Sequence, residues 1–177
     1  MTERMRDDRG LWRKALVAVP LIVMTGSLIG YLSNSGFSNE WYAPLEKPGL
    51  QPPGWAFGAA WTTLYTMMGI AVAVVLNEPA SKRRNMALVL FGVQLALNFA
   101  WSPIFFGLGM IDAGLLVILA LNLLVAMTII AFWRIRPLAG ALLIPYLAWL
   151  CLATALNHET GRLNPGADKA PLGITGA

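Results

Sequence analysis

The sequence predicts an all-α membrane protein: a bundle of five transmembrane helices with a long proline-rich loop between helices one and two. Of its 177 residues, 57% are hydrophobic and only 12% are charged, and its mean hydropathy is +0.62. These values lie far outside the range of soluble chains. The 13 basic and nine acidic residues are also spaced so that five long uncharged stretches separate them.

Each uncharged stretch is long enough for one membrane helix, which needs about 20 residues. The stretches are 25, 30, 27, 21 and 22 residues long, and they lie between Lys14 and Glu40, Lys47 and Glu78, Arg84 and Asp112, Asp112 and Arg134, and Arg136 and Glu159. We therefore expect helices at 14–33, 56–77, 85–107, 112–133 and 137–157, inside a five-helix domain of residues 14–162.

The two ends of the chain differ from this domain in composition. Residues 1–13 form a basic segment, and residues 163–177 contain glycine and proline with few large apolar side chains, which predicts a flexible tail. The single cysteine can form no internal disulfide, and the basic residues lie at helix ends. A soluble enzyme, a nucleic-acid-binding domain and a disulfide-stabilised domain are therefore excluded.

Lysine and arginine are distributed unequally between the two sides of the five helices. The larger set has ten members: Arg4, Arg6, Arg9, Arg13, Lys14, Lys82, Arg83, Arg84, Arg134 and Arg136. The smaller set has three: Lys47, Arg162 and Lys169. The positive-inside rule then places the N-terminus in the cytoplasm and both the first loop and the tail outside. The same bias favours a bacterial cytoplasmic membrane over an outer membrane.

The loop from Asn34 to Gly54 is the longest connection. Its four prolines, at 44, 48, 52 and 53, fix φ and remove backbone donors, so neither helix nor sheet is expected. Trp41 and Tyr42 are amphipathic aromatic residues, which favour the membrane–water interface. Two interpretations remain open, an interfacial anchor or a cap over a cavity.

The helix at 85–107 has two different faces at about 100° per residue. The small residues Gly92, Ala96 and Ala100 share one arc, which predicts close packing of another helix and a homodimer. The opposite arc carries Gln94, Asn98, Trp101 and Phe105. Amides inside a bilayer need hydrogen-bond partners, so this face either joins helices or binds a ligand.

Aromatic residues follow helical spacing on two other helices. Trp61 and Tyr65, with Met68 one turn on, lie on one face of the helix at 56–77. Tyr146, Trp149, Ala153 and Asn157 share an arc of the helix at 137–157, where the small Ala153 leaves space between larger groups. Such stripes either pack in the core or enclose a flat apolar ligand.

Two further features of the sequence are prolines inside the expected helices and the absence of metal-binding and catalytic motifs. Pro103 and Pro145 lie inside expected helices, where each removes a hydrogen bond and predicts a bend. The only histidine, His158, and the only cysteine, Cys151, cannot assemble a metal or haem-ligating set. No catalytic triad, phosphate-binding loop or mid-span acid is present, so we assign no catalytic residue and no metal site.

Four separated motifs carry a family resemblance. The runs W-Y-A-P-L-E-K-P-G-L-Q-P-P-G-W (41–55), W-T-T-L-Y (61–65), Q-L-A-L-N-F-A-W-S-P (94–103) and P-Y-L-A-W (145–149) resemble the TspO/MBR family of tryptophan-rich sensory proteins and the translocator protein, the former peripheral benzodiazepine receptor. The resemblance covers roughly residues 14–163. It implies a five-helix bundle, a dimer in bacteria, and a cavity under the first loop that binds protoporphyrin IX and other tetrapyrroles, sterols and synthetic ligands.

The resemblance also implies eight ligand-binding residues: Trp61, Tyr65, Gln94, Asn98, Trp101, Trp149, Ala153 and Leu156. We add Trp41 of the loop as a ninth. We expect no cofactor, and a tetrapyrrole such as protoporphyrin IX as ligand in porphyrin transport or regulatory sensing. The alternative is a light- and oxygen-dependent enzyme that degrades porphyrin with tryptophans matching Trp61 and Trp149. Sterol binding is not supported, because His158 replaces the tyrosine of the family's sterol motif before Arg162.

Overall fold

The computed structural model describes residues 2–176, with side chains from residue 9 onward. Arg4 and Arg6 of the basic segment therefore lie outside the described side chains. The described chain has five helical spans that are long and apolar enough to cross a membrane, and it has no strand. The predicted all-α class with five membrane-length helices is confirmed.

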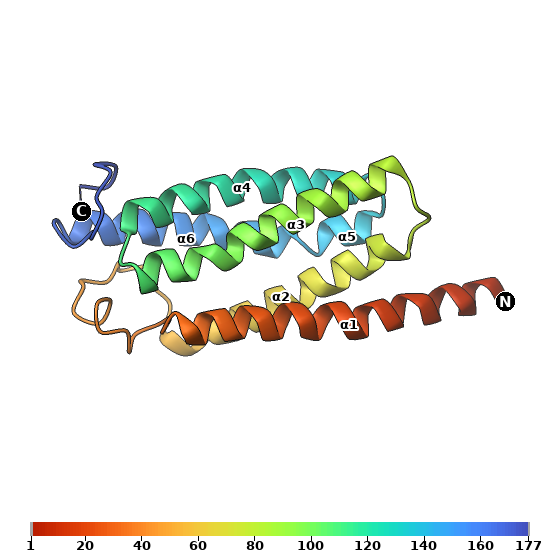
Figure 1. Ribbon diagram of the computed structural model, residues 1–177, viewed down its shortest axis with the longest axis horizontal. Helices are drawn as coiled ribbons and strands as arrows, with labels where there is room; N and C mark the ends of the chain where they lie inside the picture. The colour runs from red at the N-terminus through yellow and green to blue at the C-terminus, as the bar shows by residue number, and fades with distance from the viewer. Residues whose placement is uncertain (1, 177) are drawn as a thin grey trace.

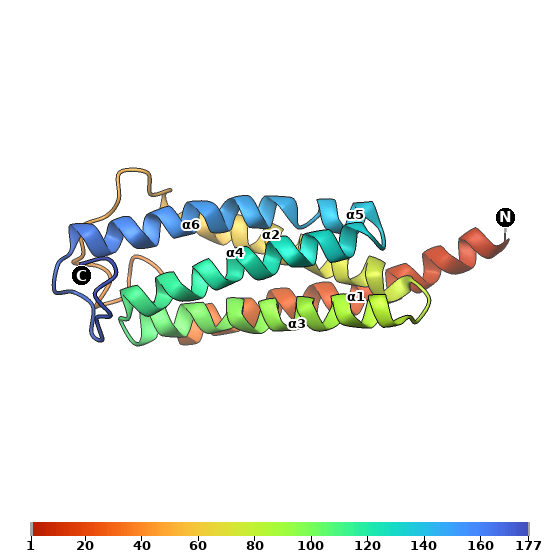
Figure 2. The same cartoon turned by 90° about the horizontal axis from the view of Figure 1, so that it is seen from above.

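Consecutive long helices run antiparallel, and the loop of residues 33–53 lies at the same end of the bundle as the C-terminal tail (Figures 1 and 2). The helical elements are α1 (Thr2–Leu32), α2 (Gly54–Asn77), α3 (Lys82–Ser102), the π-helical turn η1 (Pro103–Gly107), α4 (Ile111–Trp133), α5 (Pro137–Ala141) and α6 (Ile144–Leu163). The first loop has no helix or strand, as its prolines predict.

The helix boundaries differ from the expected ones at several places. Helix α1 begins at Thr2 rather than at residue 14, because the polar segment contains no proline and is rich in helix-forming arginine. Pro103 changes the hydrogen-bond pattern: α3 ends before it and a π-helical turn follows, with the Leu108 N–H donating to the Pro103 carbonyl at 2.9 Å.

Pro145 was expected to bend one helix, and instead it lies at the start of a new one. Helix α5 ends at Ala141, and Pro145 occupies the first turn of α6, where its missing N–H leaves no intrahelical bond unmade. Helix α6 then continues to Leu163, six residues beyond the expected end at 157. This extra length brings Thr160 into the helix, one turn beyond Asn157.

Helices α1 and α2 touch through glycines. A side chain at Gly69 would place its Cβ 2.6 Å from the Val19 Cα, and one at Gly26 would overlap the Tyr65 ring. The backbones of the two helices therefore approach more closely than alanine would allow, which is how membrane helices gain packing energy without a hydrophobic driving force. The close approach also holds Tyr65 against α1.

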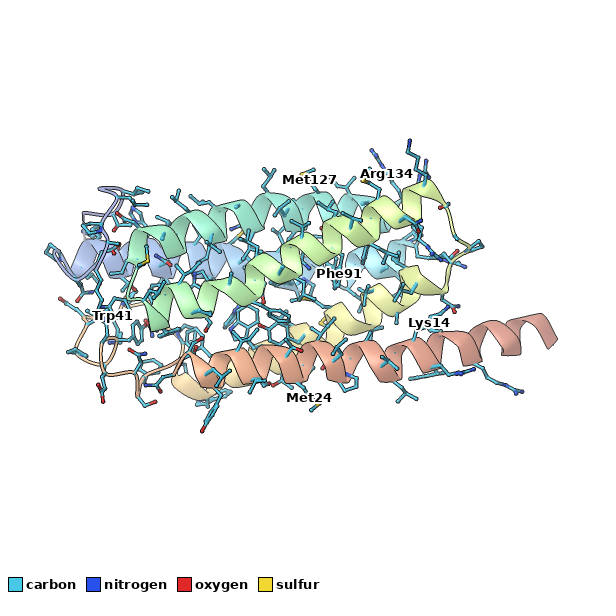
Figure 3. All side chains as sticks on the ribbon, viewed as in Figure 1. Lys14, Met24, Trp41, Phe91, Met127 and Arg134 are labelled. Atoms are coloured by element: carbon cyan, nitrogen blue, oxygen red, sulfur yellow. The ribbon has the colours of Figure 1, made fainter. Side chains whose placement is uncertain are left out.

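Apolar side chains cover the outside of the bundle as well as its core. Met24 and Met127 point away from the helices in Figure 3, and they are 69% and 47% exposed, as lipid-facing residues are. Inside, Phe91 and Phe132 stack with ring centroids 5.6 Å apart and join α3 to α4. Asn122 of α4 donates to the Thr154 hydroxyl of α6 at 2.9 Å, so this amide links helices.

The end of the bundle that carries the N-terminus is held by polar contacts. Lys14 donates to the Asn77 side-chain oxygen at 2.8 Å, joining α1 to α2. Glu78 pairs with Arg136, and its carbonyl accepts from Arg84 at 2.7 Å. These contacts tie the α2–α3 connection to the start of α5.

We expect Gly69→Ala to lower the unfolding temperature in detergent, because its new Cβ meets the Val19 backbone, with a cost of about 1–3 kcal/mol for overpacking. The matched control is Gly58→Ala on the same helix, where no atom lies within 4 Å of the added Cβ. This control should unfold at or above the wild-type temperature. A Gly69→Ala protein as stable as the wild type would show that α1 and α2 do not pack this closely.

Candidate ligand-binding site

A cavity of about 650 Å³ lies beneath the first loop, and residues of α1, α2, α3, α4 and α6 line it. Its volume falls within the roughly 300–1,000 Å³ of typical small-molecule pockets. Its lining consists of aromatic, aliphatic and small residues with neutral polar groups, and none of the described lining residues carries a charge. The cavity thus suits a largely apolar ligand.

Tryptophans of α2 and α6 form one wall of the cavity. The Trp61 and Trp149 rings lie edge to face with centroids 6.4 Å apart. The ring centroids of Tyr65 and Trp61 lie 5.1 Å apart, and those of Phe57 and Trp149 lie 5.6 Å apart. The spacing i, i+4, i+8 puts Phe57, Trp61 and Tyr65 on one face of α2, so the sequence contained a signal for Phe57 that our prediction missed.

A buried hydrogen-bond chain joins three helices beside this wall. Tyr65 donates to the Asn98 side-chain oxygen at 3.0 Å, and the Asn98 amide donates to the Tyr146 hydroxyl at 2.9 Å. Asn98 also lines the cavity. The two interpretations of the α3 amides are therefore compatible at this residue, because one side chain links helices and borders the cavity.

Two polar atoms at the cavity have no hydrogen-bond partner. Trp101 stacks on Phe105 with ring centroids 4.9 Å apart, and its indole Nε1 is buried and unpaired. The Asn157 amide nitrogen donates to the Ile111 carbonyl at 2.9 Å, but its Oδ1 is buried and unpaired. Unpaired buried groups cost about 1–3 kcal/mol each, so a ligand or water that binds them would gain affinity.

The unpaired donor and acceptor lie around Gly114 of α4. A Cβ at this position would be 3.0 Å from Asn157 Oδ1 and 3.5 Å from Trp101 Nε1. The missing side chain lets both polar atoms lie close to the α4 backbone. Because both atoms are fully buried, a group that accepts from Trp101 and donates to Asn157 reaches them only when these side chains shift. A hydroxyl group or a water molecule has both capacities.

Seven of the nine expected ligand-binding residues line the cavity, namely Trp61, Tyr65, Asn98, Trp101, Trp149, Ala153 and Leu156. Two do not. Gln94 lies one turn from Asn98, is 1% exposed, and both polar atoms of its amide lack a partner. Trp41 packs on Phe105 with centroids 5.5 Å apart and donates to the Ala167 carbonyl at 3.1 Å, so it supports the loop from outside the cavity.

The first loop forms a cap rather than only an anchor. The Tyr42 ring lies 5.8 Å from Phe105 and 5.2 Å from Phe106, and its hydroxyl hydrogen-bonds with Gln51. Both Tyr42 and Gln51 line the cavity. Burial raises the pKa of the Tyr42 phenol, although the Gln51 hydrogen bond lowers it in part.

Polar contacts within the loop fix its shape. The Asn39 side chain accepts from the backbone N–H groups of Trp41 and Tyr42 at 3.0 and 2.9 Å. Lys47 donates to the carbonyls of Tyr42 and Leu45 at 2.6 Å each, and its ammonium lies 4.2 Å from the centre of the Tyr42 ring. Burial lowers the pKa of Lys47. Sequence reasoning assigned Lys47 no role, because only the folded loop brings these carbonyls together.

The C-terminal tail lies against this cap and the start of α4, although its composition predicts a flexible segment. Asn164 accepts from the Glu46 N–H at 2.7 Å and donates to the Glu46 carbonyl at 2.9 Å. Asp168 accepts from the Asp112 N–H at 2.7 Å and so caps α4 from a distant part of the chain. The tail and the loop appear at one end of the bundle, with Trp41 between them (Figure 3).

Asp112 is the main attachment point of the tail. Its carboxylate is 0% exposed and accepts from the N–H groups of Leu172, Ile174 and Thr175 at 2.8, 3.1 and 3.0 Å. The Thr175 hydroxyl donates to it at 2.7 Å. Four donors, at the positive end of the α4 dipole, offset the cost of burying this charge.

No set of three or more His, Cys, Asp or Glu residues that could hold a metal ion occurs among the described side chains. Cys151 is exposed on α6, and its thiol lies 3.5 Å from the Asn122 side-chain oxygen. His158 is also exposed. The polar groups at the cavity are thus neutral amides, hydroxyls and indoles, the kinds of group that orient ligands in small-molecule sites.

This fold and site define a class: a multi-pass membrane protein with an aromatic cavity closed by a loop between its first two helices. The sequence pattern of the TspO/MBR family matches residues 16–163. The chain belongs to that family, and the resemblance of its four motifs is confirmed.

Several relatives are similar over most of their length. The chain is 38% identical over 160 residues to the tryptophan-rich sensory protein of Cereibacter sphaeroides, which covers 90% of this chain and 95% of that protein. It is 40% identical over 143 residues to the translocator protein of Homo sapiens, and the match covers 80% of this chain and 85% of that protein. The tryptophan-rich protein TspO of Chlorobaculum tepidum is 43% identical over 126 residues, covering 71% and 80%.

Replacing Asp112 with Asn should release the tail, because an amide group presents one acceptor oxygen and an NH₂ group to four donors. We expect faster hydrogen exchange at the amides of Leu172, Ile174 and Thr175, measured by mass spectrometry. Glu40→Gln is the control, since Glu40 is exposed on the cap. Unchanged exchange in Asp112→Asn would mean that the carboxylate does not hold the tail.

Proposed function

We propose that the protein binds a tetrapyrrole such as protoporphyrin IX in the cavity and acts in porphyrin transport or regulatory sensing. Membership of the TspO/MBR family supports this function, as do the names of two relatives, a sensory protein and a translocator protein. The observation that supports it most strongly is the pair of unpaired buried atoms, Trp101 Nε1 and Asn157 Oδ1, beside an aromatic cavity.

The tryptophan wall offers a surface on which a flat ring binds. Trp61 and Trp149 belong to different helices and both border the cavity, so one planar ligand contacts both. Each aromatic contact contributes about 0.5–1.5 kcal/mol beyond area burial. Binding of this kind requires no residue with a catalytic role, and we assign none.

The uncharged lining determines how a porphyrin would be oriented. A carboxylate is costly to bury without a charged partner, and protoporphyrin IX carries two. The exposed lining residues Asn34, Ser35 and Ser38 supply neutral hydrogen-bonding groups where the cavity meets the outside. We therefore place the two carboxylates at this opening and the ring against the tryptophan wall.

We expect Trp101→Phe, which keeps an aromatic ring but removes the N–H, to weaken protoporphyrin IX binding about 2- to 12-fold, the equivalent of one hydrogen bond of about 0.5–1.5 kcal/mol. Asn157→Leu should act similarly, since it removes the acceptor. Quenching of tryptophan fluorescence by protoporphyrin IX, titrated in detergent, measures both effects. Trp133→Phe is the control, because Trp133 is 47% exposed at the far end of α4.

Two results would contradict the proposal. Wild-type protein that binds no protoporphyrin IX would remove its basis, and equal affinities of wild type, Trp101→Phe and Asn157→Leu would place the ligand elsewhere. Illumination of the complex in air tests the enzymatic alternative. Conversion of the porphyrin to a new product by wild type, absent in Trp61→Phe and Trp149→Phe proteins that still bind, would replace binding by degradation as the function.

We also propose a homodimer through the small-residue face of α3. Gly92 and Ala96 are exposed, Ala100 is half-buried, and nothing lies within 4 Å of a Cβ at Gly92. This face points away from the buried Gln94 and Asn98. Small residues allow the close backbone approach that membrane helix pairs use.

Ala96→Leu should convert the dimer to a monomer, because the larger side chain separates the two α3 helices. Native mass spectrometry in detergent measures the mass of the assembly. Met127→Leu, on the outer face of α4, is the control and should stay dimeric. An Ala96→Leu protein that remains dimeric but no longer binds ligand would mean that the two faces of α3 are reversed.

A further inference from the structure

A second, smaller hollow lies at the opposite end of α3 from the cavity. It is a groove of about 210 Å³ between the start of α3 and the end of α4. Six residues line it: Arg83, Met86, Ala87, Leu90, Ala131 and Arg134. Its walls are apolar, and each of the two helices contributes one guanidinium group.

The two arginines of the groove have no partner among the described side chains. Both are exposed, and neither guanidinium group makes a hydrogen bond or ion pair with a described side chain. The neighbouring arginines differ, since Arg84 donates to the Glu78 carbonyl and Arg136 pairs with the Glu78 carboxylate. The groove therefore has two uncompensated positive charges, and Figure 3 shows Arg134 pointing out from the bundle.

The position of the groove matches the boundary between lipid headgroups and acyl chains. Arg83 is the second residue of the α3 span, and Arg134 directly follows the α4 span. The exposed Trp133 beside Arg134 is typical of this interface. Leu90 lies seven residues along α3 from Arg83, about 10 Å deeper at 1.5 Å per residue. The charged rim thus lies at headgroup level and the apolar wall below it.

We propose that this groove is a binding site for an anionic phospholipid. The phosphate lies between Arg83 and Arg134, because guanidinium groups bind phosphate oxygens with paired, charge-assisted hydrogen bonds. One acyl chain follows the apolar wall of Met86, Leu90 and Ala131. Basic pockets between membrane helices are a known kind of lipid site. This site is independent of the cavity and of the tetrapyrrole proposal.

The test uses the full chain, delipidated in detergent and titrated with phosphatidylglycerol or with phosphatidylcholine, with bound lipid counted by native mass spectrometry. Wild type should bind phosphatidylglycerol more tightly than phosphatidylcholine. Arg83→Gln with Arg134→Gln should weaken phosphatidylglycerol binding roughly 25-fold, which corresponds to about 2 kcal/mol for two arginines at about 1 kcal/mol each. Phosphatidylcholine binding should change little.

A control with the same loss of charge separates a site from general attraction. Arg9→Gln with Arg13→Gln removes two exposed arginines from α1 at the same end of the bundle, and it should retain phosphatidylglycerol binding within about twofold. Ala131→Trp, which keeps all charges but fills the groove, should lose the lipid. It tests the acyl-chain part of the site without altering the arginines.

Three results would overturn the proposal. An equal loss of affinity in the two double variants would indicate non-specific attraction to a basic surface. Equal binding of the two lipids by wild type would remove the role of the headgroup charge. Displacement of phosphatidylglycerol by excess inorganic phosphate would show that the arginines bind free phosphate and that the apolar groove is not part of the site.

Discussion

The requirement that polar groups inside a membrane protein find partners within the chain governs this structure, because hydrocarbon offers none. The Tyr65–Asn98–Tyr146 chain and the Asn122–Thr154 link meet this requirement, and both fasten helices together. Trp101 Nε1 and Asn157 Oδ1 do not meet it. They are the atoms that we propose a ligand would pair with, whereas Gln94, equally unpaired, lies away from the cavity lining.

The cap and the tail apply the same rule at the end of the bundle. Lys47 satisfies loop carbonyls, Asn39 satisfies loop N–H groups, and Asn164 binds both backbone groups of Glu46. The buried Asp112 carboxylate collects four donors from the tail. The loop over the cavity is thus held by its own polar contacts and by Asn164, so changes in the tail should reach the ligand site through the cap as well as through α4.

The five membrane spans could be predicted from the sequence, because each long uncharged stretch in this apolar chain has the length of one membrane helix. The sequence also separated the faces of α3, because helical period puts Asn98 and Trp101 opposite Gly92 and Ala96. Its failures concern tertiary contacts. Helical periodicity does not indicate that Gln94 lies beyond the cavity lining. No local pattern links the Asp112 carboxylate to hydrogen-bond donors of the tail, which lie 60 or more residues away in the sequence.

The central claim is that a planar tetrapyrrole occupies the cavity beneath the cap, and a structure of the full chain with protoporphyrin IX in lipid nanodiscs tests it most directly. We expect the ring to lie against Trp61 and Trp149, with its carboxylates at the opening near Asn34 and Ser35 and with a ligand group or a water between Trp101 Nε1 and Asn157 Oδ1. Porphyrin bound only outside the cavity, or an empty cavity at saturating porphyrin, would contradict the account.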